Sequence, residues 1–236
     1  MQASLQSLLN LFCALSNLLN GLRNMGTIES AAEELGGLRL PPDLEPLEVA
    51  GQGSHSITFR ADYRGDILAM KVYRPASIER FRKKHQVNIA VYEMSRNRKF
   101  RKIPELLPFT AKPIAVMGHD GKSTLMFLQE YIENFHLQEL AEQNGGLPGS
   151  VLEAGETIVR VSEMNDLHDL ELSVENVIVR KQSGVWSPVL FDFNQPPVAE
   201  KTSNSLFARA FKGAGKKSKL DYQALAQWRI CSEKYS

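Results

Sequence analysis

The order of strand-like and helix-like patterns is the feature that most constrains the fold of this chain. β-Branched and aromatic residues at 56–64 and a strongly apolar run at 67–73 flank a Gly-Asp turn, which predicts a hairpin of two strands. Residues 77–98 then carry apolar side chains at helical spacing, with Ser77 as the cap. The first part of the chain therefore predicts a sheet with one accompanying helix.

The rest of the chain is mostly helical in pattern. The elements expected there are, in order, a strand hairpin at 114–117 and 124–128, helices at 136–143 and 150–164, short strands at 177–179 and 189–191, and a helix at 221–233. Strands followed by a mainly helical region indicate the α+β class and an arrangement in two lobes.

Composition places the chain among ordinary globular proteins. It has 236 residues, of which 43% are hydrophobic and 23% charged, enough for one compact domain with a short extension. The net charge of +1 gives no field that would recruit nucleic acid. No apolar run reaches the roughly 18 residues that a membrane span needs. Two cysteines, Cys13 and Cys231, make no disulfide framework, so we expect a reducing compartment. We therefore expect a soluble, cytoplasmic protein. We also expect it to be a monomer.

Three stretches of different composition suggest the domain organisation. Apolar residues recur at helical spacing over 1–25, which predicts an amphipathic helix that serves in secretion or in binding a partner. Residues 26–46 contain Gly-Gly and Pro-Pro pairs and have the composition of a linker. The main domain is expected over 47–236, with one lobe at 47–129 and the other at 133–236.

A glycine-rich turn lies where the first strand should lead into the second. Gly51, Gln52, Gly53 and Ser54 form it, and glycines there let backbone N–H groups approach phosphates without a Cβ in the way. The third glycine of a G-x-G-x-x-G pattern is absent, and Ser56 stands in its place. On its own, a G-x-G in a hairpin is usually just a turn.

Lys71 lies inside the apolar strand that follows this turn. A buried lysine is costly unless its charge has a partner. It could instead lie at a sheet edge, with its stem on apolar surface and its amine in water. Because it follows a glycine-rich turn by a short distance, we interpret it as a phosphate-binding lysine.

This pair of features resembles the protein kinases, whose pattern is a glycine-rich loop followed by a V-A-I-K strand. Here the strand ends L-A-M-K at Lys71. Residues 171–176, E-L-S-V-E-N, resemble the D-L-x-x-x-N part of the catalytic loop, and residues 190–194, L-F-D-F-N, resemble the strand that ends in D-F-G, with Asn in place of Gly. The four motifs follow one another in kinase order, and the resemblance covers residues 47 to 233.

The resemblance implies a set of ligand-binding residues. Lys71 would contact the α- and β-phosphates of ATP under the glycine-rich turn. Asn176 and Asp192 would hold Mg²⁺. The segment from Glu130 to Ile132 would be the hinge that meets adenine.

The residue at the position of the catalytic base departs from the kinase pattern. Counting back five residues from Asn176 gives Glu171, where kinases have an aspartate. A glutamate is one methylene longer, and misplacement by about 1 Å can cost roughly 100-fold in rate, so slow chemistry is expected. Asp169, beside His168, is the alternative base, but it would require two extra residues before Asn176.

The carboxylate that should pair with Lys71 is left open by the sequence. Glu93 is the best placed in the expected helix, and Glu79 is the alternative. A kinase-style pairing could also fall near Asn88, which would leave Lys71 without an ion pair.

The C-terminal part is short for a kinase. Too few residues follow Asn194 for a full C-lobe, and the A-P-E motif is absent. The segment that begins at Asp221 resembles the helix whose aspartate braces the kinase catalytic loop. This truncated plan is similar to the minimal effector kinases of the OspG and NleH group, which bacteria inject into host cells. The resemblance therefore implies a serine/threonine-protein kinase that acts on a host protein in the host cytosol, with an activating protein partner.

Two other functions fit the same motifs. Glu171, the lost D-F-G glycine and the open helix glutamate would also suit a pseudokinase that works as a binding module. A bacterial kinase for a small molecule or a lipopolysaccharide sugar would share the fold.

Overall fold

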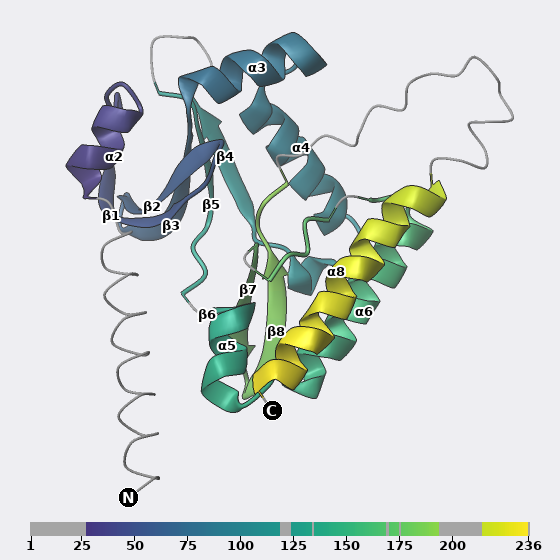
Figure 1. Cartoon of the computed structure of the whole chain (residues 1–236). Helices are drawn as coiled ribbons and strands as arrows, with labels where there is room; N and C mark the ends of the chain where they lie inside the picture. The colour runs from purple at the N-terminus through teal and green to yellow at the C-terminus, as the bar shows by residue number, and fades with distance from the viewer. Residues whose placement is uncertain are drawn as a thin grey trace, which may run out of the picture.

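The computed structural model describes residues 27–118, 124–133, 135–168, 170–174, 176–193 and 214–235. It is a mixed α+β arrangement in which a sheet occupies the first part of the chain and helices dominate the second (Figure 1). The amphipathic helix predicted for 1–25 lies outside the described residues. None of the described helices is both long and apolar enough to cross a membrane.

An antiparallel sheet of five strands forms the first part, in the order β1-β2-β3-β5-β4. The strands are β1 Leu44–Gln52, β2 Ser56–Tyr63, β3 Asp66–Tyr73, β4 Pro113–Met117 and β5 Met126–Glu130. The two predicted hairpins are thus confirmed. Because β3 lies between β2 and β5, both of its edges are hydrogen-bonded, and its residues are among the most buried in the sheet.

A short helix, α2 (Ile28–Glu34), packs on β1, within the stretch predicted to be a linker. Ala31 and Leu35 are buried in the same apolar cluster as the sheet residues, and the Thr27 hydroxyl caps the helix. The prediction of a linker over 26–46 was wrong because seven residues give too few turns for a periodic signal. The packed part of the chain therefore begins before residue 47.

Two helices, α3 (Pro75–His85) and α4 (Ile89–Arg101), replace the single helix predicted over 77–98. The break comes at Gln86, whose φ of 57° lies in the left-handed region and ends α3. Asn88 then caps α4, since its side-chain oxygen accepts the first free backbone N–H groups.

Ser77 does not cap the first of these helices. Helix α3 already begins at Pro75, a residue that suits the first helical position because its missing N–H would have no partner there. The Ser77 hydroxyl instead makes a hydrogen bond with Nδ1 of His55, at 3.2 Å. The helix therefore starts two residues earlier than predicted and is tied to the turn between β1 and β2.

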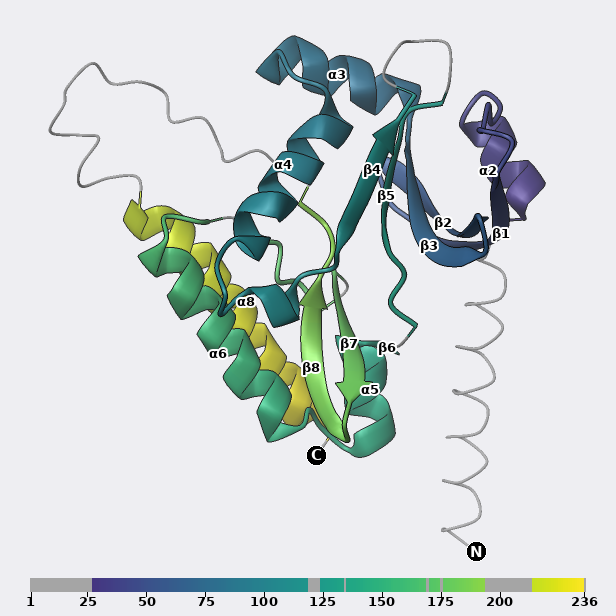
Figure 2. The same ribbon diagram turned by 180° about the vertical axis from the view of Figure 1, so that it is seen from behind.

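The described residues of the second part contain a small sheet, one short α-helix and two long α-helices. Its elements are η1 Leu107–Phe109, β6 Phe135–His136, α5 Leu137–Asn144, α6 Gly149–Met164, β7 Val177–Gln182, β8 Val185–Leu190 and α8 Ala214–Tyr235. The helices and strands predicted here are confirmed, although both strands are longer and α8 begins earlier than expected. Helices α6 and α8 lie side by side (Figures 1 and 2), with α6 packed on β8 and α8 packed on α6 and α5.

The core of the second part is built around Trp228 of α8. Its ring is fully buried and lies against α6 at Gly155, where an added Cβ would come within 2.6 Å of the ring. Glycine at this position is what lets the two helices approach closely. The ring centres of Phe100 and Phe193 lie 4.9 Å apart, and this contact extends the core to α4.

The two parts of the chain are joined near the end of β8. The N–H of Ala111, just before β4, donates to the carbonyl of Leu190 at 2.9 Å. The neighbouring Thr110 forms a parallel bridge with Leu190. This junction fixes where the residues after β8 lie relative to the five-stranded sheet.

Candidate functional site

Lys71 is the centre of a buried group of charges. It lies in β3 opposite Thr58 of β2 and Phe127 of β5, and 3% of its surface is exposed. Its Nζ donates to Oε1 of Glu93 at 2.9 Å and to Oδ1 of Asp192 at 2.8 Å. Burial alone would lower the pKa of the amine, but the two carboxylates outweigh that effect and raise it above its usual value. Lys71 therefore stays charged in the interior.

Glu93 of α4 receives hydrogen bonds from three directions. Oε1 accepts from Lys71 and, at 3.3 Å, from the backbone N–H of Phe193, while Oε2 accepts from the Tyr73 hydroxyl. The side chain is fully buried. Burial raises the pKa of Glu93, and the charge of Lys71 and the hydrogen bond from Tyr73 oppose that rise. A single carboxylate thus connects α4, β3 and the segment after β8.

The alternatives considered for the partner of Lys71 have other contacts. Glu79 pairs with Lys83 one turn along the exposed face of α3, at 2.6 Å. Asn88 caps α4. The structure therefore brings Lys71 together with Glu93.

Asn176 and Asp192 lie at the same end of the β7–β8 hairpin. Val177, the first residue of β7, pairs with Leu190, the last residue of β8, so the residues just outside this pair are neighbours. The side chain of Asp192 is 21% exposed. Carboxylate and amide oxygens are ligands that Mg²⁺ accepts, so these two residues are the ones that could hold it. The described residues contain no cluster of three or more His, Cys, Asp or Glu side chains suited to a metal ion.

Glu171 lies next to these residues in an unusual environment. Its backbone φ is 51°, in the left-handed region that non-glycine residues rarely adopt. Within the described part of the chain, its buried Oε1 atom has no hydrogen-bond partner. Burial, followed by the negative charge of Asp192, raises the pKa of Glu171 to about 8, against the opposing charges of Lys71 and Arg96. Asp169, the alternative base, lies outside the described residues.

Helix α8 holds the backbone on both sides of Glu171. The N–H of Leu170 donates to Oδ1 of Asp221 at 3.0 Å, which is the contact that the sequence resemblance implied. Nε1 of Trp228 donates to the carbonyl of Leu172 at 2.7 Å. Trp228 lies outside the kinase-like motifs, and no local pattern could reveal a hydrogen bond to a loop 56 residues away.

The glycine-rich turn is held from outside the sheet by Arg74. The carbonyl of Gly53 accepts from Nε of Arg74 at 3.2 Å and from Nη2 at 3.1 Å, and the same guanidinium pairs with Glu34 of α2. An added Cβ at Gly51 would meet no atom within 4 Å. The protein's own packing therefore does not require glycine at 51, which leaves room for a ligand to approach the backbone.

The side chains of the predicted hinge are occupied within the protein. Glu130 accepts from Nη1 of Arg180 at 3.1 Å and from the N–H of Lys112 at 2.9 Å. Ile132 is 9% exposed and packs against Ala111 and Val189. The side chains at the two ends of this segment are therefore engaged within the protein, which leaves its backbone and the half-buried Tyr131 for contact with a ligand.

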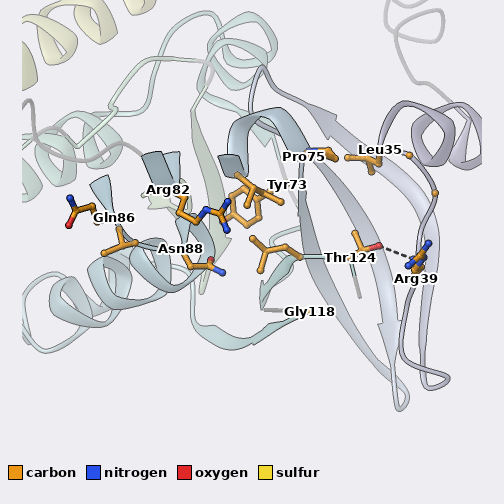
Figure 3. Close-up of a pocket in the computed structure, with 14 residues that line it drawn as sticks. Leu35, Arg39, Tyr73, Pro75, Arg82, Gln86, Asn88, Gly118 and Thr124 are labelled. Atoms are coloured by element: carbon orange, nitrogen blue, oxygen red, sulfur yellow. Dashed lines mark hydrogen bonds between the residues drawn. The ribbon is translucent and has the colours of Figure 1, made fainter. Parts of the chain in front are cut away.

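A cavity of about 550 Å³ is lined in part by Tyr73, the residue whose hydroxyl binds Glu93 (Figure 3). It is lined by the loop after α2, helix α3, the break before α4 and the residues just after β4 and just before β5. At its edge the N–H of Arg39 donates to the Thr124 hydroxyl at 2.8 Å. None of the predicted nucleotide-binding residues lines this cavity.

The chemistry available to the site follows from its charges. A buried amine can bind an oxyanion, and the carboxylate of Asp192 with the amide of Asn176 can bind a divalent cation beside it. Comparison of the sequence with protein-family models and with curated proteins finds no match. The geometry of the site is thus the basis for a functional assignment.

Proposed function

We propose that this chain has a two-lobed, protein-kinase-like fold with a truncated C-lobe and is an ATP- and Mg²⁺-dependent phosphotransferase that acts on Ser or Thr hydroxyls of a protein. One observation carries the proposal: Nζ of Lys71 bonds at once to Glu93 of a helix and to Asp192 after a β-hairpin. In protein kinases a strand lysine pairs with a helix glutamate and an aspartate beside them holds Mg²⁺, and both contacts must be in place for transfer.

The remaining residues take roles around this centre. The turn over residues 51–54 would cover the phosphates, and Lys71 would contact them. Asn176 and Asp192 would hold Mg²⁺. The bound ion would neutralise the charge of the phosphates. Glu171 would orient the acceptor hydroxyl, with Asp169 as the alternative base.

The likeness to the OspG and NleH group extends the proposal to the setting of the reaction. The motif order and the bracing of the 170–172 loop by Asp221 support membership in such a truncated kinase group. The chain would then be a bacterial effector that phosphorylates a host protein in the host cytosol, and an activating partner belongs to the same proposal.

Transfer of a radiolabelled phosphoryl group from ATP to lysate proteins tests the proposal. Wild type should label protein, and Asp192→Ala should abolish the label, whereas Asp43→Ala, which removes an exposed aspartate paired with Arg64, should leave it intact. Label that is equal in wild type and Asp192→Ala would overturn the proposal. Label on lipopolysaccharide sugars or small molecules instead of protein would favour the small-molecule kinase.

A pseudokinase that binds nucleotide without transfer is the second candidate, and Glu171 is the observation that favours it. A carboxyl with a pKa of about 8 is largely neutral at pH 7 and is then a poor acceptor for the substrate proton. Stabilisation by Mg²⁺-ATP, together with an absence of labelling at every pH up to 9, would support this function over the kinase.

A further inference from the structure

Tyr73 is a buried tyrosine that no sequence motif singled out. It is the last residue of β3, two positions after Lys71, so both side chains project from the same face of the strand. Its ring is 1% exposed and packs with Phe81, Ile89 and Phe127. This packing fixes where its hydroxyl lies.

The hydroxyl of Tyr73 binds the oxygen of Glu93 that Lys71 does not use. Oε1 of Glu93 accepts from Lys71 and from the N–H of Phe193, and Oε2 accepts from Tyr73. Among the described residues, Tyr73 is the hydrogen-bond partner of Oε2. A buried carboxylate oxygen without a hydrogen bond is costly, so this contact stabilises the ionised Glu93.

The contact also restricts rotation of the carboxylate. The terminal torsion of a glutamate is broad, so a carboxylate held through one oxygen alone can turn about its last bond. With Oε2 bonded to Tyr73, Oε1 faces Lys71 and the N–H of Phe193. Nζ of Lys71 lies 5.8 Å from the centre of the Tyr73 ring, so ring and amine are near neighbours.

We propose that Tyr73 is a positioning residue, whose hydroxyl fixes the Glu93 carboxylate and through it the direction in which Lys71 presents its amine to the phosphates. The effect on phosphoryl transfer rests on the proposed function, whereas the restraint that Tyr73 places on Lys71 through Glu93 does not. Small displacements at a reacting centre are expensive in rate, so loss of one hydroxyl here is expected to be visible in kcat.

Kinetics of Tyr73→Phe test the role in transfer. We expect kcat to fall about tenfold while the KM for ATP changes less than twofold, because the amine is misdirected rather than removed. In a Glu93→Ala background the same substitution should change kcat less than twofold, since no carboxylate remains to be fixed. Tyr63→Phe is the matched control, because Tyr63 is likewise the last residue of its strand, β2.

Chemical modification of Lys71 tests whether Tyr73 restrains the amine, and this measurement does not depend on phosphotransferase activity. A small amine-reactive reagent should modify Lys71 about fivefold faster in Tyr73→Phe than in wild type, as followed by peptide mass spectrometry. The rate of Lys71 modification in Tyr63→Phe should equal that in wild type. In the Glu93→Ala background, Tyr73→Phe should change this rate less than twofold. If wild type shows no Asp192-dependent transfer, the proposed function fails and this measurement still decides the role of Tyr73. Unchanged modification in Tyr73→Phe, or an equal increase in both backgrounds, would overturn the proposal.

Discussion

At the residue scale, Glu171 is placed where its neutral form is favoured. Its carboxyl is partly withdrawn from water and close to the negative charge of Asp192, while Lys71 and Arg96 offset only part of this. Its left-handed backbone costs free energy, and such conformations persist where the surroundings over-determine them. Here the contacts of α8 with Leu170 and Leu172 provide that constraint.

The first prediction concerns the pH dependence of transfer. If Glu171 accepts the substrate proton, kcat/KM should rise about tenfold from pH 7 to pH 9 and then level off, because the ionised fraction grows through a pKa of about 8. Initial rates between pH 6 and 9.5 measure this, since kcat/KM reports groups of the free enzyme. Glu171→Gln should be slow at every pH and lose the rise, whereas Glu153→Gln, an exposed control on α6, should keep it.

As part of the first prediction, the raised pKa of Glu171 also sets the sign of a change in stability with pH. The carboxyl has a pKa near 4.5 when unfolded and about 8 when folded, so between these values the folded state binds more protons. The contribution of Glu171 to the free energy of unfolding should therefore fall as pH rises from 4.5 to 8. Urea unfolding at pH 5 and pH 8.5 should show a smaller pH-dependent loss in Glu171→Gln than in wild type. An identical loss in both proteins would contradict this placement of Glu171.

At the element scale, strands and long helices could be predicted because their periodicity is local. The break between α3 and α4 could not, because Gln86 adopts a left-handed conformation that usually signals glycine. That break sets where α4 begins and how it is rotated about its own axis. The rotation in turn determines which carboxylate faces Lys71. This is why the sequence left Glu93 and Glu79 as alternatives.

The second prediction concerns the connection between α2 and the glycine-rich turn. Arg74→Ala removes two hydrogen bonds to the carbonyl of Gly53 and the ion pair with Glu34. Without them the glycine-rich turn is no longer held in place, so part of the free energy of nucleotide binding is spent on ordering it. We expect the KM for ATP to rise roughly three- to tenfold with a smaller change in kcat. Steady-state kinetics at varied ATP measure it. Arg229→Ala, which breaks an exposed pair with Glu156 between α8 and α6, is the control. An equal KM in Arg74→Ala and wild type would refute the prediction.

The third prediction concerns the packing of α6 on α8. Gly155→Ala places a Cβ 2.6 Å from the Trp228 ring and 2.8 Å from Leu225, so it should lower the free energy of unfolding by about 1–3 kcal/mol. Gly149→Ala, at the first residue of α6, meets no atom within 4 Å and should be neutral or stabilising by up to about 1 kcal/mol. Urea denaturation of both variants measures the difference. A Gly155→Ala protein as stable as Gly149→Ala would mean that the helices can separate without cost.

At the scale of the whole molecule, the site is made by residues that are distant in sequence. Lys71 and Asp192 are 121 residues apart, and Leu170 and Asp221 are 51 apart. The order of the motifs could predict that Lys71 and Asp192 lie together, as they do. It could not predict the hydrogen bonds of Tyr73 or Trp228, because these depend on how whole elements pack.

The fourth prediction follows from a ligand that would contact both parts of the chain. If Mg²⁺-ATP binds Lys71 in the sheet and Asp192 after β8, it should raise the melting temperature of one cooperative transition. At 100 times its Kd the gain is about 2.7 kcal/mol, which corresponds to roughly 5–10 °C for a chain of this size. Differential scanning fluorimetry with Mg²⁺-ATP, with ATP and EDTA, and with neither measures it.

The variants in the same experiment separate binding from transfer. Asp192→Ala and Asn176→Ala should lose the Mg²⁺-dependent part of the shift, because they remove the proposed metal ligands. Glu171→Gln should keep the full shift although it transfers slowly, because its proposed role concerns the acceptor hydroxyl rather than the nucleotide. A shift that is absent in wild type, or unchanged in Asp192→Ala, would show that the charges around Lys71 serve the stability of the fold and not a nucleotide.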